Sequence, residues 1–329
     1  MEKKPQVITL QNEYLRVGLT NYGAAIYFFQ MKEGDGWADI ALTRDTLEEF
    51  MENRDYYGAT VGRVANRIKN GRAVIAGREY QLHCNEGANC LHSGKTTFAW
   101  RLWDVEEKEN GVIFRLQSPD GEGGFPGNVR VEAEYRLEGD RLWMYHRAET
   151  DQETIFGMTN HTYWCLSGLG EKIYDQQLQL NANFFIETDE ELIPTGQILA
   201  VKGTAFDFNA PQRLGDVLGD EHPMIKGNRG YDVSFVRNQR EYGLAARLVC
   251  PNTRRVLEVE SSSPDMHLYT GNFLKNAPGK GDIRYTIHTA LCLEPGRFPD
   301  TVNQPHFGEI FLKPGQPYEE TICVRASHI

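Results

Sequence analysis

Cysteine, long apolar runs and signal-like segments are all scarce in this chain of 329 residues. Six cysteines are too few for a disulfide scaffold, and most lie in apolar, strand-like stretches, so we expect reduced core thiols. No run approaches the roughly 20 apolar residues of a membrane span. The amino end leads into no apolar segment of the kind found in signal peptides. We therefore expect no membrane partner and a cytoplasmic location.

Positive charge is also in short supply. Lys and Arg number 35 against 46 Asp and Glu, which gives a net charge of -11. Nucleic acids and anionic membranes are bound through clustered Lys and Arg, so neither is expected as the main partner. A neutral or cationic small ligand is favoured instead. The hydrophobic content of 40% is enough for one large core or two modest ones.

Helical spacing is nearly absent, and its best example is the short segment 46–52. Alternating apolar and polar positions joined by turn residues recur instead, and they predict strands at 72–75, 79–82, 131–137, 142–146, 244–250, 255–260, 310–312 and 321–324. No linker or repeat divides the chain. We therefore predict an all-β fold, a large antiparallel β-sandwich that forms a single domain over residues 1–329. The length also allows two packed sub-sandwiches.

Three polar residues interrupt strand-like segments in a way that suggests chemistry. Glu294 follows an apolar run and precedes Pro295, and a carboxylate there carries a desolvation cost that usually implies a partner or a chemical role. His161 and His92 are the other two, and we expect all three on short turn-like segments between strands. Together they are the groups of a general acid/base site. The alternatives are a Glu294 salt-bridged at a sheet rim and histidines hydrogen-bonded in the core.

Arg67 and Asp232 are further candidates. An arginine fork binds vicinal hydroxyls or a carboxylate, or else it lies on an exposed edge. Asp232 accepts hydrogen bonds from sugar hydroxyls, or else it caps a turn. Four aromatic residues offer faces for sugar C–H groups or belong to the core, namely Tyr163, Trp164, Tyr231 and Phe298.

A zinc site is a further interpretation of the same residues. His92, His161 and Glu294 match a known catalytic ligand set of two histidines and one glutamate. Metal ligands usually include a closely spaced pair in the sequence, and these three residues are far apart. We therefore expect no metal.

Several segments, taken together, carry a resemblance. They include Gly-Arg-Val-Ala-Asn-Arg-Ile at 62–68, Asn-Cys-Leu-His-Ser-Gly at 89–94, Thr-Asn-His-Thr-Tyr-Trp at 159–164, Phe-Asp-Phe at 206–208, Tyr-Thr-Gly-Asn at 269–272 and Leu-Glu at 293–294 followed by Phe-Pro-Asp at 298–300. In order and spacing, over nearly the whole chain, they resemble the aldose 1-epimerase (galactose mutarotase) family.

The resemblance implies a β-supersandwich fold, no cofactor, and interconversion of the α and β anomers of a monosaccharide such as galactose or glucose. It also implies roles for individual residues. Glu294 would be the base and His161 the acid. The groups that would position the substrate are His92, Asn66, Arg67 and Asp232, together with His267, which stands where the family often has Gln.

Acid/base catalysis by this pair needs an ionised Glu294 and a protonated His161. With ordinary pKa values near 4.3 for Glu and 6.5 for His, both conditions hold only in a band around about pH 5.5. Activity at neutral pH would therefore require the neighbouring carboxylate to raise the pKa of His161, and this is what we expect.

Other functions would need other features. A glycoside hydrolase needs a second carboxylate facing Glu294, for which Asp232 is the obvious residue. A non-catalytic sugar-binding module would need neither His161 nor Glu294. An epimerase of a phosphorylated sugar should have a basic cluster beyond Arg63 and Arg67, and an epimerase of another modified sugar or a disaccharide is a further alternative.

The chain departs from the family pattern at Ser93, Val233, His267 and Gly296. Loss of polar side chains at 233 and 296 removes possible partners for sugar hydroxyls, although His267 can supply one. A site without a partner for a hydroxyl discriminates weakly between sugars that differ there. We therefore predict kcat/KM values for galactose and glucose, which differ at C4, within about tenfold of each other. Anomerisation rates measured under one set of conditions test this, and a hundredfold preference would contradict it.

Overall fold

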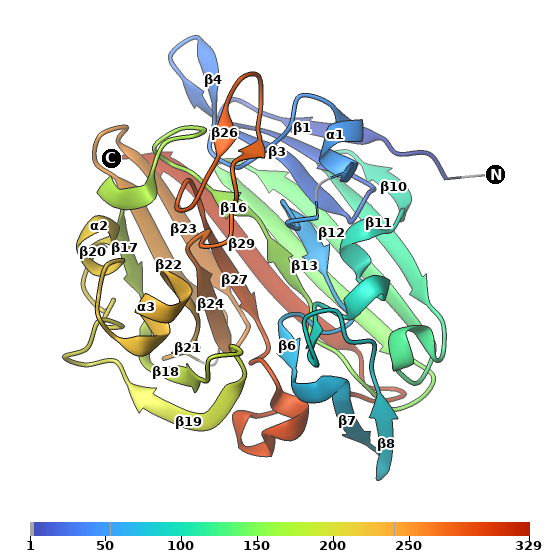
Figure 1. The fold of residues 1–329 in the computed structure, drawn as a ribbon. Helices are drawn as coiled ribbons and strands as arrows, with labels where there is room; N and C mark the ends of the chain where they lie inside the picture. Colours follow the sequence, from blue (N-terminus) through green and yellow to red (C-terminus); the bar gives the residue numbers. More distant parts are fainter. Residues whose placement is uncertain (1–2, 53, 240) are drawn as a thin grey trace.

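The computed structural model describes residues 3–52, 54–239 and 241–329. Its two largest sheets have nine and six strands, and every strand pair in them is antiparallel. Figure 1 shows the long strands of both sheets running through the centre of the molecule, with short strands and turns around them. The predicted all-β, antiparallel architecture is confirmed.

The nine-stranded sheet has the order β10 (Asp104–Lys108), β11 (Gly111–Ser118), β12 (Val129–Glu138), β13 (Arg141–Thr150), β29 (Tyr318–His328), β23 (Arg255–Ser261), β22 (Gly243–Cys250), β17 (Gln177–Leu180) and β20 (Gln212–Arg213). The six-stranded sheet has the order β16 (Tyr163–Trp164), β27 (Leu291–Gly296), β24 (Asp265–Tyr269), β21 (Asp232–Arg237), β18 (Ala182–Thr188) and β19 (Pro194–Ala200).

A four-stranded sheet consists of β1 (Val7–Gln11), β2 (Leu15–Thr20), β3 (Ala25–Glu33) and β4 (Gly36–Asp39). The two-stranded pairs are β5 (Ala59–Val61) with β15 (Thr159–His161), β6 (Arg67–Ile68) with β9 (Cys90–Leu91), β7 (Arg72–Ile75) with β8 (Arg78–Gln81), β14 (Thr154–Ile155) with β28 (Phe311–Leu312), and β25 (Ala277–Pro278) with β26 (Arg284–Tyr285). The described helices are α1 (Leu47–Glu52), α2 (Leu214–Val217) and α3 (Pro223–Asn228). Short 3₁₀ segments lie at Lys69–Gly71, Gly94–Thr96, Phe98–Trp100, Glu122–Gly124, Ile173–Asp175, Thr301–Asn303 and Pro305–Phe307.

The main core joins side chains of both large sheets. Leu248 and Val259 of the nine-stranded sheet belong to one apolar cluster with Leu268 and Leu293 of the six-stranded sheet. Because successive side chains of a strand point to opposite faces, the neighbours of these residues on β24 and β27 face away from that core. The polar residues of β24 and β27 are therefore collected on the outer face of the six-stranded sheet.

The predicted strands match the observed ones closely. The hairpin at 72–82 is β7 and β8, the alternating pair at 131–146 is β12 and β13, and the pair at 244–260 is β22 and β23. The helix expected at 46–52 is α1. All six cysteines are free, as expected, and five of them are buried. None of the helices in the described part of the chain is long and apolar enough to cross a bilayer.

Candidate active site

Cross-strand register brings most of the candidate residues together on the outer face of the six-stranded sheet. Glu294 on β27 lies opposite His267 on β24, and His267 lies opposite Ser234 on β21. Asp232 is two residues before Ser234 on the same strand, so its side chain points to the same face. A carboxylate, a histidine, a hydroxyl and a second carboxylate thus stand side by side.

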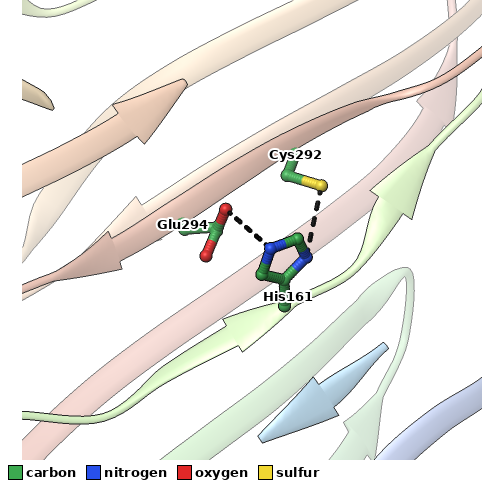
Figure 2. A group of neighbouring side chains, drawn as sticks. All are labelled: His161, Cys292 and Glu294. Atoms are coloured by element: carbon green, nitrogen blue, oxygen red, sulfur yellow. Dashed lines mark hydrogen bonds and ion pairs between the residues drawn. The ribbon is translucent and has the colours of Figure 1, made fainter. Parts of the chain in front are cut away.

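His161 completes an acid–base pair with Glu294. It comes from β15, and its Nε2 lies 3.5 Å from Oε1 of Glu294. The Sγ atom of Cys292 lies 3.5 Å from the other ring nitrogen, Nδ1, so the imidazole is contacted at both nitrogens (Figure 2). The side chains of His161 and Glu294 are only 7% and 5% exposed. The pair is therefore almost completely removed from bulk water.

Burial sets the electrostatics of this pair. It raises the pKa of Glu294 well above its ordinary value, and the nearby negative charge of Asp232 raises it further. Burial also lowers the pKa of His161 to about 4. The expectation that the carboxylate would raise the pKa of His161 was wrong, because the desolvation of the imidazolium outweighs the attraction. Between these two values the pair carries one proton, which the two groups share.

His92 and Asn66 lie across the site, and each has a left-handed backbone conformation. His92 follows β9 with φ of 51°, and Asn66 precedes β6 with φ of 62°. The backbone N–H of Asn66 donates to Nδ1 of His92 at 3.0 Å, which makes Nδ1 an acceptor and leaves Nε2 to carry the proton. Burial holds the pKa of His92 well below 6.5, so it is a neutral donor. The ring centroids of His92 and His161 are 5.5 Å apart.

Asp232 is held between Arg67 and His267. Its Oδ1 lies 2.9 Å from Nε2 of His267, and its Oδ2 lies 3.8 Å from Nη1 of Arg67. Burial alone would raise the pKa of Asp232, but Arg67 and His267 outweigh it and lower the pKa below 3.8. Arg67 itself donates from Nε and Nη2 to the two carboxylate oxygens of Glu86, at 2.6 and 2.9 Å. Asp232 is therefore a fixed, charged acceptor.

These groups share one pocket of about 150 Å³. All of the site residues predicted from the sequence line it, namely Asn66, Arg67, His92, His161, Asp232, His267 and Glu294. A larger depression of about 680 Å³, lined by Ser118, Arg130 and Asp151 among others, contains none of them. We assign the site by the buried acid–base pair rather than by cavity size.

The aromatic lining was only partly predicted. Tyr163 lines the pocket, but Trp164 and Tyr231 are buried in the main core and Phe298 packs in a separate apolar cluster. The pocket instead contains Tyr56, Tyr269 and Phe273. Aromatic residues are abundant in this core, and nothing in the sequence separates those that face the pocket from those that face the core.

The expected turn-like setting was wrong for two of the three key residues. Glu294 lies within β27 and His161 ends β15, and only His92 lies in a turn. A third correction concerns Val233, which is buried in the main core on the opposite face from Asp232. Among the departures used above to predict weak C4 discrimination, Val233 therefore has no bearing on the sugar. Gly296 does not line the pocket either, so that prediction depends on His267.

Cys292, Ser234 and Glu86 are site residues that the sequence interpretation missed. Cys292 and Ser234 each lie two residues from a predicted site residue on the same strand, so period-two alternation could have identified both. Glu86 lies in a loop without periodicity, and its contact with Arg67 has no sequence signal.

The zinc interpretation included one wrong residue, His92. In the described part of the chain, the group with ligand atoms close enough for a metal ion is His161, Cys292 and Glu294, without His92. Cys292 and Glu294, however, contact different nitrogens of one imidazole, whereas an ion would bind through one nitrogen. This geometry fits a histidine hydrogen-bonded on both sides better than a metal ligand.

Comparison with known proteins decides the family. The sequence profile described as aldose 1-epimerase matches residues 6–325. The chain belongs to the aldose 1-epimerase family. It is 42% identical to a galactose mutarotase from Bos taurus over 322 residues, which cover 97% of this chain and 93% of that protein. An aldose 1-epimerase from Haemophilus influenzae is 34% identical over 326 residues, covering 96% and 94%.

Solved structures of the aldose 1-epimerase family have the same fold. An aldose epimerase homologue from C. elegans superposes with a TM-score of 0.92 at 28% identity, covering 99% of this chain and all of that one. A galactose 1-epimerase from Lactobacillus acidophilus superposes with a TM-score of 0.87 at 29% identity, covering 100% and 97%. The β-supersandwich expected from the sequence is thereby confirmed.

The shared proton predicts a bell-shaped pH dependence for this aldose 1-epimerase family member. Below about pH 4 both groups are protonated and no base is present, and above the raised pKa of Glu294 neither is protonated and no acid is present. We predict that kcat/KM for α-galactose, measured by polarimetry after subtraction of the spontaneous rate, falls on both sides. His161→Asn should remove the alkaline limb and most of the activity. A parent protein whose kcat/KM does not fall at alkaline pH, up to the pH at which it unfolds, would contradict this.

Proposed function

We propose that this protein is a mutarotase that interconverts the α and β anomers of aldohexoses such as galactose and glucose. The observation that carries the proposal is the buried pair of Glu294 and His161, 3.5 Å apart in a pocket lined by hydroxyl-binding groups. Its relatives named galactose mutarotase and aldose 1-epimerase support the same reaction.

Glu294 and His161 supply the two proton transfers of the reaction. In the tautomer with Glu294 ionised and His161 protonated, Glu294 removes the proton of the anomeric hydroxyl while His161 protonates the ring oxygen. The bond between C1 and the ring oxygen breaks and the C1 aldehyde forms. Rotation about the C1–C2 bond exposes the other face. Reclosure reverses both proton transfers, so neither group gains or loses a proton over the cycle.

The remaining pocket residues would hold the sugar away from C1. Neutral His92 offers an Nε2–H donor, and charged Asp232 offers an acceptor, to hydroxyl groups. Asn66, Arg67 and His267 fix those two groups and add donors at the pocket wall. Because the reaction joins two anomers of nearly equal energy, contacts distant from C1 bind both of them equally.

An uncharged sugar fits the site better than a phosphorylated one. Arg67 is already bound by Glu86 and faces Asp232. Arg63 is buried away from the pocket, where it donates to Ser118 and to the carbonyls of Pro119 and Pro126. A third arginine, Arg54, lines the pocket, where its Nη1 donates to the hydroxyl of Tyr22 and its guanidinium packs over Trp100. All three arginines thus have partners within the protein.

Glycoside hydrolysis is the second candidate, because the pKa values of Glu294 and Asp232 are pushed apart as in an acid and nucleophile pair. Asp232, however, has one oxygen occupied by His267 and the other facing Arg67. This setting suits a hydroxyl acceptor rather than an attacking group. Release of nitrophenol from nitrophenyl galactosides would favour the hydrolase, and the mutarotase proposal expects none.

The wider context of the reaction follows from composition. We propose that the chain acts in the cytoplasm as one domain over residues 1–329, with a small neutral sugar as its ligand and without a cofactor or a nucleic-acid or membrane partner. The acidic composition supports the absence of a nucleic-acid or anionic-membrane partner.

Glu294→Gln tests the catalytic role of the carboxylate. The amide keeps the shape of the side chain but cannot accept the anomeric proton, so we predict a loss of about 10²- to 10⁴-fold in kcat for α-galactose by polarimetry. Glu320→Gln is a matched control, because Glu320 is also buried with a raised pKa but does not line the pocket. A Glu294→Gln protein that relaxes α-galactose at the parental rate would show that Glu294 is not the base.

A further inference from the structure

A chain of buried hydrogen bonds leads from Asp232 through His267 and Ser234 to Asp265. Ser234 Oγ lies 2.9 Å from Oδ2 of Asp265 and 3.0 Å from Nδ1 of His267. His267 Nε2 lies 2.9 Å from Oδ1 of Asp232. All four side chains are buried, and of the four only Asp232 and His267 line the pocket. Asp265 and Ser234 therefore contact the site only through His267.

Register explains why these residues form a chain. Ser234 lies opposite His267 on the neighbouring strand, and Asp265 lies opposite Val236, two pairs further along. Alternation places Asp265, His267, Ser234 and Asp232 on one face, so each polar group meets the next diagonally or directly. All members of this hydrogen-bond chain lie on strands of the sheet, and none lies in a loop.

Counting the protons shows which group donates and which accepts in each hydrogen bond. If Asp265 carries a proton, its O–H donates to Ser234, the Ser234 O–H donates to Nδ1 of His267, and Nε2–H of His267 donates to Asp232. Every polar hydrogen is then used, and Asp232 is the only charged member. If Asp265 is ionised, Ser234 must donate to it, and His267 must carry protons on both nitrogens to satisfy its two partners.

Burial favours the first arrangement. The ionised alternative places two further charges in the sheet, which is costly without water. Burial raises the pKa of Asp265 well above 3.8. No described residue forms a hydrogen bond with its buried second oxygen, Oδ1, and a neutral carboxyl group tolerates this better than a carboxylate does.

We propose that Asp265 and Ser234 are positioning residues, which hold the His267 ring with its Nε2–H toward Asp232 and so fix Asp232 as the acceptor for a sugar hydroxyl. This inference rests on the proposed mutarotase function. Oδ1 of Asp232 is engaged by His267, whereas Oδ2 lies 3.8 Å from Nη1 of Arg67, beyond hydrogen-bond distance, and is available to the substrate.

Ser234→Thr and Ser234→Val are a matched pair that differs by one hydroxyl group. Both add similar bulk at the same buried position, so packing strain is common to the two. We expect Ser234→Val to have a KM for galactose about tenfold above that of Ser234→Thr, with kcat within about threefold, because the contact lies away from C1. Equal KM values, or a loss confined to kcat, would overturn the proposal.

Asp265→Asn tests the protonation of Asp265. An amide N–H donates to Ser234 as a protonated carboxyl group does, so the KM should stay within about threefold of the parent value. A tenfold rise would show that a carboxylate is needed and would overturn the arrangement.

A measurement on the parent protein separates this proposal from the proposed function. ¹⁵N NMR of labelled histidine at neutral pH should show His267, assigned by its loss in His267→Gln, as a neutral ring protonated at Nε2. Protonation at Nδ1 or at both nitrogens would overturn the positioning chain, whether or not the parent is active. If the parent does not relax α-galactose, the mutarotase proposal fails, but this signal still tests the hydrogen-bond chain.

Discussion

Desolvation of ionisable groups on one face of a β-sheet is the constraint on which the site depends. The opposite face of β21, β24 and β27 belongs to the main core, so these strands cannot shift register without burying polar residues there. The same register that packs Leu268 and Leu293 inward therefore sets Glu294, His267 and Ser234 in a row. Core packing and site geometry have a common cause.

Burial then determines what each group does. Among the described residues no arginine lies as close to Glu294 as Arg67 lies to Asp232, so burial raises the pKa of Glu294, whereas Arg67 helps to lower the pKa of Asp232. The two carboxylates on one sheet face thus have pKa values shifted in opposite directions, which fits the different roles proposed for them. Burial lowers the pKa of His161 to about 4, so His161 holds its second proton weakly.

The sequence predicted this site better than the details of its setting. Alternation identified the strands, and the family motifs identified seven of the polar residues that line the pocket, but not Arg54, Asp55 or Glu86. The pKa of His161 was predicted in the wrong direction, because the extent of burial depends on how β5 and β15 cover the sheet, and spacing along the chain does not reveal that. Glu86 was missed for a similar reason, since its loop reaches Arg67 only in the folded chain. Alternation could have placed Val233 in the core and Ser234 in the site had it been applied to β21.

The shared proton of Glu294 and His161 is the central claim, and NMR titration of the sugar-free protein tests it most directly. Carboxyl ¹³C signals of labelled glutamate, with Glu294 assigned by its loss in Glu294→Gln, report its ionisation, and ¹⁵N signals of histidine report His161. We predict that Glu294 stays protonated to a pH well above 4.5 and that His161 takes up a second proton only near about pH 4. A Glu294 that ionises at or below its ordinary pKa, beside a His161 that titrates near 6.5, would contradict the account.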